Sequence, residues 1–75
     1  MSKVLSIDGY AVIDNEKINV RTISDTRRAA IVNWLVVDRE ILISNATSDE
    51  EIERLWVRER ETAYVAKVEI TLPTR

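Results

Sequence analysis

Three arginines gather where a predicted strand leads into a predicted helix. Arg27 and Arg28 open the helix, and Arg21 lies on the strand before it. Cations at the start of a helix oppose its dipole, so they do not stabilise the helix itself. With the free amides of residues 24–26, the three guanidinium groups would form an anion-binding site for a phosphate.

These arginines also have a structural interpretation, because carboxylates within one chain or across two subunits would pair with them. The candidates are Asp14, Asp25 and Glu69. A net charge of −2 gives no overall attraction to nucleic acid or anionic lipid, since binding by counterion release needs a concentrated positive surface. Ion pairing is therefore the first expectation, a nucleic-acid partner is second, and no membrane partner is expected.

Catalytic groups are scarce in this chain. It has no histidine and no cysteine, which excludes the usual base for a nucleophile, disulfides, zinc sites and iron–sulfur clusters. Carboxylate-only metal sites stay open. The single glycine excludes the glycine-rich loops of nucleotide-binding enzymes. We expect no cofactor, and an enzyme would have to use carboxylates and arginines alone.

The remaining titratable groups have ordinary interpretations. Lys3 lies near the start of the chain, Lys17 in a polar turn and Lys67 on an outward strand face, so all three are expected at the surface. The carboxylates of residues 49–53 belong to the exposed start of a helix rather than to an apolar pocket. No residue is predicted to be catalytic.

The elements that carry these residues begin with a predicted β-hairpin. Residues 4–7 and 10–13 are β-like, with a bulge or turn expected at Gly9 between them. A polar turn at 14–17 leads to residues 18–23, whose alternation places Ile18, Val20 and Thr22 on one face.

Two helices and two more strands follow. Residues 24–26 can cap a helix whose apolar stripe includes Ala30, Ile31, Trp34 and Leu35. Residues 41–43 predict a short strand, and Ser48 with Glu51 forms the capping box of a second helix containing Ile52, Leu55 and Trp56. Residues 64–72 alternate, and Pro73 should end that strand. The residues expected to point inward are Tyr64, Ala66, Val68, Ile70 and Leu72.

This order predicts one α+β domain over residues 1–75. Its two layers would be an antiparallel or mixed sheet, in the order β-β-α-β-α-β, with both helices packed on one face. At 75 residues the chain has room for a single core. We see no leader sequence and no apolar run long enough to cross a bilayer, so the cytoplasm is the expected compartment.

The first helix is apolar around most of its circumference. Val32 and Val36 fall outside its main stripe, and one sheet face cannot cover them all. Trp34 and Trp56 are expected in the core, with a role in an interface as the alternative. These four residues are the candidate interface of a homo-oligomer, most simply a dimer.

Residues 20–35, followed by residues 48–56, resemble small uncharacterised proteins of bacteriophages and prophages. The resemblance implies an accessory protein in a bacterial cytoplasm and implies no activity or site residues. The function expected from the sequence is thus a small non-enzymatic interaction module that self-associates, with a possible further protein partner. The alternative is a nucleic-acid or phosphate-binding accessory protein that uses the arginine cluster.

Overall fold

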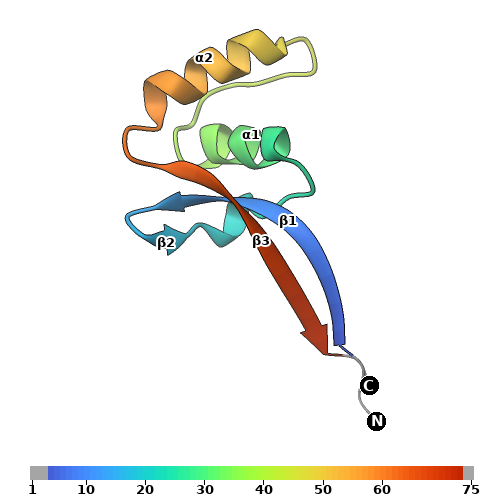
Figure 1. The fold of residues 1–75 in the computed structure, drawn as a ribbon. Helices are drawn as coiled ribbons and strands as arrows, with labels where there is room; N and C mark the ends of the chain where they lie inside the picture. Colours follow the sequence, from blue (N-terminus) through green and yellow to red (C-terminus); the bar gives the residue numbers. More distant parts are fainter. Residues whose placement is uncertain (1–3, 74–75) are drawn as a thin grey trace.

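The computed structural model describes residues 4–73 and shows a small α+β fold. Strand β1 (Val4–Asp14) lies in the centre of a three-stranded antiparallel sheet, between β2 (Lys17–Ile18) and β3 (Tyr64–Pro73). Helices α1 (Arg27–Val37) and α2 (Asp49–Glu59) both lie on one side of it (Figure 1). The predicted fold class is confirmed.

The turn between β1 and β2 is confirmed as a two-residue hairpin loop. Asn15 and Glu16 both have left-handed backbone angles, with φ of 52° and 63°. Two consecutive residues with positive φ form the turn whose twist matches that of paired strands. Asp14 therefore pairs directly with Lys17, and Ile13 with Ile18.

The bulge or turn predicted at Gly9 is wrong. Strand β1 runs without interruption through Gly9, which lies opposite Val68 in a continuous register with β3. Glycine avoids a tight contact here, because another backbone segment comes close. A β-carbon at this position would lie 3.1 Å from the carbonyl oxygen of Ser24.

The strand predicted over residues 18–23 is also wrong beyond Ile18. The chain turns instead through a short 3₁₀ helix, η1 (Val20–Thr22), capped by the side chain of Asn19. Thr22 is fully buried, whereas Ile18 and Val20 are exposed. The Thr22 hydroxyl accepts a hydrogen bond from the Val12 amide at 2.8 Å and donates one to the Asn19 carbonyl at 2.7 Å. These bonds override the alternating pattern, because a buried amide needs a partner.

Both helices begin where their caps predict. The Thr26 hydroxyl accepts from the Ala29 amide, and the Ser48 hydroxyl accepts from the Glu51 amide. The strand predicted at 41–43 is wrong, because this segment has no strand to pair with and stays an irregular connection. Two of its branched side chains, those of Ile41 and Ile43, pack against the hydrophobic core instead.

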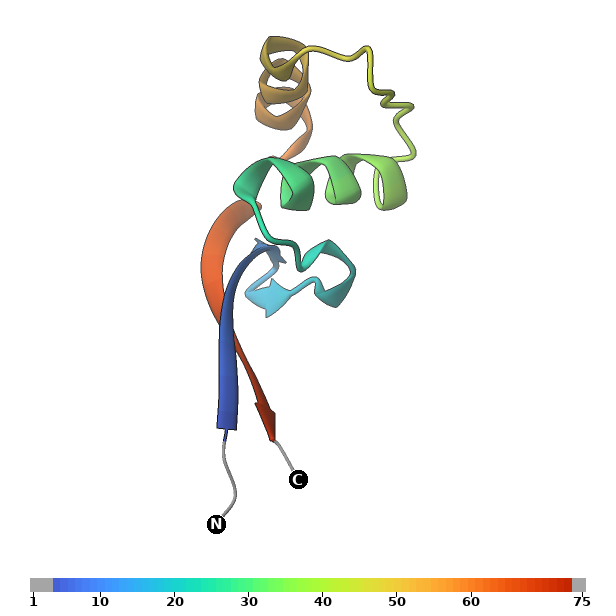
Figure 2. The same cartoon turned by 90° about the vertical axis from the view of Figure 1, so that its right-hand side faces the viewer.

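The core lies between the sheet and the two helices. Its buried members are Val12, Ile31, Trp34, Leu35, Ile52, Trp56 and Ala63. Helix α1 contacts both β1 and β3, while α2 packs on α1 (Figure 2). Beyond this packed region β1 and β3 continue together as a two-stranded ribbon of residues 4–8 and 69–73, which we call the arm (Figure 1).

Candidate functional site

The two tryptophans named as interface candidates lie inside the subunit. Trp34 is 1% exposed and Trp56 3% exposed, which confirms the expectation that both are core residues. Their rings meet edge to face, and the Arg39 guanidinium lies 4.8 Å from the centre of the Trp34 ring. Neither indole ring is therefore accessible to a partner.

The two valines named with them differ in position. Val32 is half-buried and packs against the core. Val36 and its neighbour Val37 are exposed, at 42% and 44%. The apolar surface that α1 leaves open is therefore confined to its C-terminal turn, and it is smaller than the sequence pattern indicates.

A larger apolar surface lies on the sheet. Side chains of directly opposed residues in an antiparallel pair share a face, and successive pairs alternate between faces. One face carries the pairs Tyr10 with Lys67 and Val12 with Val65, and the last two side chains pack with the core under the helices. The other face of the sheet carries only apolar residues among the described side chains, and we call it the apolar sheet face. Its members are Ile7, Gly9, Ala11, Ile13, Ile18, Tyr64, Ala66, Val68 and Ile70.

The inward direction predicted for β3 is confirmed in part. Ala66, Val68 and Ile70 are half-buried, and the side chains predicted to face water, Lys67, Glu69 and Thr71, are exposed. The alternating residues share a face as expected, but the helices cover the opposite face through Val65. Tyr64 departs from the prediction, because its side chain is 51% exposed. The side chain of Leu72, also predicted to point inward, lies outside the described residues.

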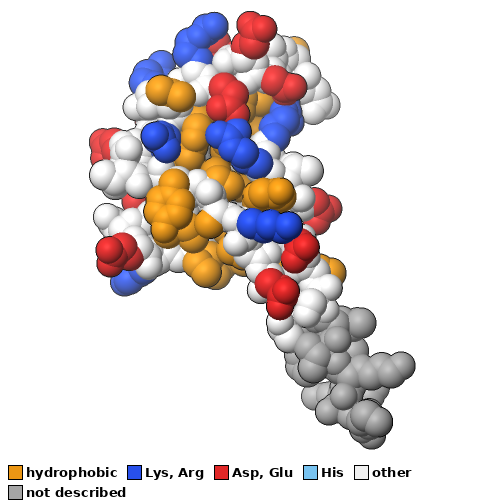
Figure 3. All heavy atoms as spheres, viewed as in Figure 1, with side chains coloured by type: hydrophobic (Ala, Val, Ile, Leu, Met, Phe, Trp, Pro, Cys, Tyr) orange, Lys and Arg blue, Asp and Glu red, His pale blue; other side chains and the backbone are white. Residues whose placement is uncertain are grey.

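The apolar sheet face is only partly covered. Ala11 and Ile13 are buried, whereas Ile7 and Ile18 are each about half exposed. In the view of Figure 3 hydrophobic side chains gather between the helices and the arm, with charged side chains around them. Sequence reasoning did not name Ile7 or Ile18 as interface residues, although their place in alternating strands was a signal for a shared face.

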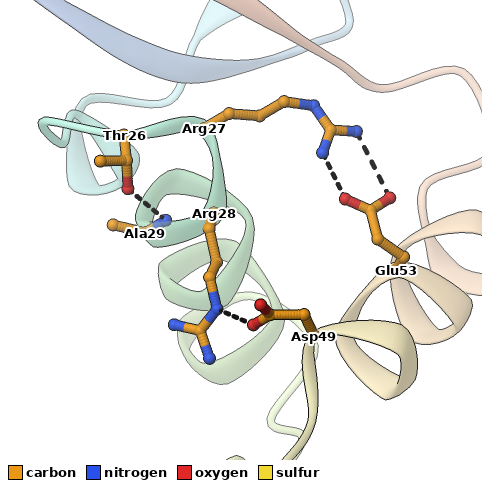
Figure 4. A network of polar contacts seen from close by, with 6 residues as sticks. All are labelled: Thr26, Arg27, Arg28, Ala29, Asp49 and Glu53. Atoms are coloured by element: carbon orange, nitrogen blue, oxygen red, sulfur yellow. Dashed lines mark hydrogen bonds and ion pairs between the residues drawn. The ribbon is translucent and has the colours of Figure 1, made fainter.

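The arginine cluster forms ion pairs within the chain. Arg28 Nε lies 2.5 Å from an Asp49 carboxylate oxygen, and Arg27 donates to both carboxylate oxygens of Glu53 (Figure 4). Intramolecular pairing was the first expectation, but the partners come from α2 rather than from Asp14, Asp25 or Glu69. The two pairs connect the first turn of α1 to the first turns of α2.

Arg21 takes no part in these pairs. It is exposed on η1 and lies within 4 Å of no carboxylate among the described residues. The turn that precedes α1 already takes part in other hydrogen bonds through Ser24 and Thr26. The Ser24 amide donates to the Tyr10 carbonyl at 2.9 Å, and the Thr26 hydroxyl is used as the helix cap. A phosphate at this position would compete with Glu53 for Arg27 and with Asp49 for Arg28.

One open depression of about 460 Å³ lies beside the β1–β2 turn, lined by Asn15, Glu16, Thr62 and Tyr64. Within residues 4–73 no group of three or more acidic side chains is placed to hold a metal ion. Neither described helix combines the length and the apolar character that a membrane span requires.

No protein-family model, curated protein or solved structure matches this chain.

Proposed function

We propose that this protein is a small non-enzymatic interaction module that functions as a homo-oligomer. The observation that supports this best is the apolar sheet face, because Ile7, Ile18 and Tyr64 on it are each about half exposed. Exposed apolar patches of this kind are typical of protein interaction sites. A domain of this size also gains stability from association.

Sedimentation velocity over a concentration series tests the proposal. We expect the mass to rise above that of one chain in the micromolar range. Ile18→Asp should lower the apparent mass without loss of helical circular dichroism, because Ile18 is 52% exposed and contributes little to the core. Val57→Asp is the matched control, since Val57 is exposed on α2 and lies outside the apolar sheet face.

Val36→Asp examines the contribution of α1 in the same assay. A fall in mass with this variant would extend the interface to the end of that helix. A strict monomer at high micromolar concentration would overturn the proposal. Salt-dependent binding of short RNA or DNA by such a monomer would favour the arginine alternative, since phosphate contacts weaken steeply with salt.

A further inference from the structure

Strand β3 leaves one edge of the sheet open. In the order β2-β1-β3 it is the outer strand, and no residue between 4 and 73 pairs with its far edge. Figure 2 shows no other element beside β3 on the side away from β1. The edge of β1 that faces away from β3 is not open in this way, because residues 19–24 form hydrogen bonds with it at Tyr10 and Val12. An open edge presents unpaired amides and carbonyls that a further strand can use.

The backbone groups that face this edge can be assigned. Tyr10 exchanges hydrogen bonds with Ser24, at 2.8 Å and 2.9 Å, so its amide and carbonyl point away from β3. In an antiparallel pair the residue opposite then also directs its groups outward. Lys67 is opposite Tyr10, and alternate residues of β3 follow the same direction. The residues that face the open edge are Val65, Lys67, Glu69 and Thr71.

We propose that two copies of this chain pair through β3, antiparallel and centred on Val68, to form one six-stranded sheet. This inference rests on the proposed self-association and names its geometry. In this register the edge-facing Lys67 lies opposite Glu69 of the second copy, and Val65 lies opposite the second copy's Thr71. Each of these pairs can exchange two backbone hydrogen bonds, while Val68 lies on the two-fold axis.

Charge selects this register over its neighbours. Centring the pair on Lys67 places two lysines opposite each other, and centring it on Glu69 places two glutamates opposite each other. Like charges directly opposed across strands are destabilising, whereas opposite charges stabilise the pair. Of these three registers, only the one centred on Val68 forms two Lys–Glu pairs.

Charge within the single chain also favours this partner. Asp8 and Glu69 are directly opposed on β1 and β3, which places two carboxylates side by side. Lys67 lies 3.7 Å from Asp8, while Glu69 has no cation within 4 Å among the described residues. A second copy would bring its own Lys67 to Glu69. On the other face Val68 would meet Val68, and Ile70 would meet Ala66, so the apolar sheet face would continue across both copies.

Charge exchange gives the first test. Lys67→Glu leaves glutamate at positions 67 and 69, and Glu69→Lys leaves lysine at both. Like charges would then face each other across the two copies, so each variant alone should dimerise at least about tenfold more weakly. Mixed together they should form a heterodimer, because both cross-strand pairs are then of opposite charge. The double exchange K67E/E69K should restore the homodimer. Circular dichroism of each variant checks that the subunit remains folded.

Crosslinking gives the second test, because the chain has no cysteine of its own. The non-hydrogen-bonded pair on the axis has its α-carbons about 4.5 Å apart, which a disulfide can span. V68C should therefore form a covalent dimer under mild oxidation. A66C is the matched control on the same face. Ala66 would lie opposite Ile70 of the second copy, so the two introduced cysteines would be four residues apart along the strand and should not crosslink.

The results separate this inference from the proposed function. Heterodimer formation with selective crosslinking of V68C supports β3 pairing. A dimer that forms normally in both single charge variants and does not crosslink through V68C overturns β3 pairing but leaves self-association standing. A strict monomer in the unmodified chain overturns both.

Discussion

The indole rings of Trp34 and Trp56 meet edge to face, with centroids 5.2 Å apart and planes at 83°. This contact joins α1 to α2 at the centre of the core. Because α2 packs on α1 rather than on a strand, the pair carries much of the attachment of α2 to the rest of the fold.

Trp56→Ala is expected to lower the free energy of unfolding by about 3 to 5 kcal/mol, because it removes a buried ring and leaves a cavity. Urea denaturation followed by circular dichroism measures this. Val57→Ala changes the next residue of the helix, which is 69% exposed, and should change stability by less than about 0.5 kcal/mol. Equal effects of the two substitutions would contradict the assignment of Trp56 to the core.

Thr22→Val keeps the shape of a fully buried side chain and removes its hydroxyl. The Val12 amide would lose its 2.8 Å partner, and an unpaired buried amide lowers stability by about 1 to 3 kcal/mol. Thr22→Ser retains the hydroxyl and serves as the control in chemical denaturation. If the serine variant were the less stable of the two, the methyl group rather than the hydrogen bond would be the important feature.

Glu16→Gly is expected to stabilise the protein by about 0.5 to 1 kcal/mol. Glu16 has a φ of 63°, a conformation that disfavours residues with a β-carbon, and Asn-Gly is the preferred sequence for this turn. Thermal denaturation should show a higher midpoint. Glu50→Gly, within α2, should lower the midpoint because it places glycine in a helix.

The pair Arg27 with Glu53 is half exposed on both sides, so its contribution should be modest and sensitive to salt. A double-mutant cycle with R27Q and E53Q is expected to give a coupling of about 0.5 kcal/mol at low salt. At about 1 M salt, where charges are screened within a few ångströms, the coupling should disappear. A coupling that persists there would indicate a hydrogen bond that does not depend on charge.

Local chemistry made the helices predictable. Ser48 with Glu51, and Thr26 with the residues after it, specify where each helix begins through hydrogen bonds between near neighbours. The strands predicted at 18–23 and 41–43 failed for a tertiary reason. In the second segment Ile41 and Ile43 pack against the core, and in the first Thr22 binds an amide ten positions away in the sequence.

The candidate surfaces were predictable only in part. The alternation in β3 indicates which side chains share a face, but the route of the chain decides which face the helices cover, and this depends on contacts distant in sequence. The arginine cluster shows the same limit. Arg28 pairs with Asp49, 21 residues further along the chain, and no local pattern connects them.

At the far end of the arm Val4 is paired with Pro73, which places the two ends of the described chain next to each other and away from the helices. Any domain or tag joined to either end would emerge from the same point. A short linker between these ends, with a new opening in the 41–47 connection, would therefore give a circularly permuted protein that retains every strand and helix of the fold.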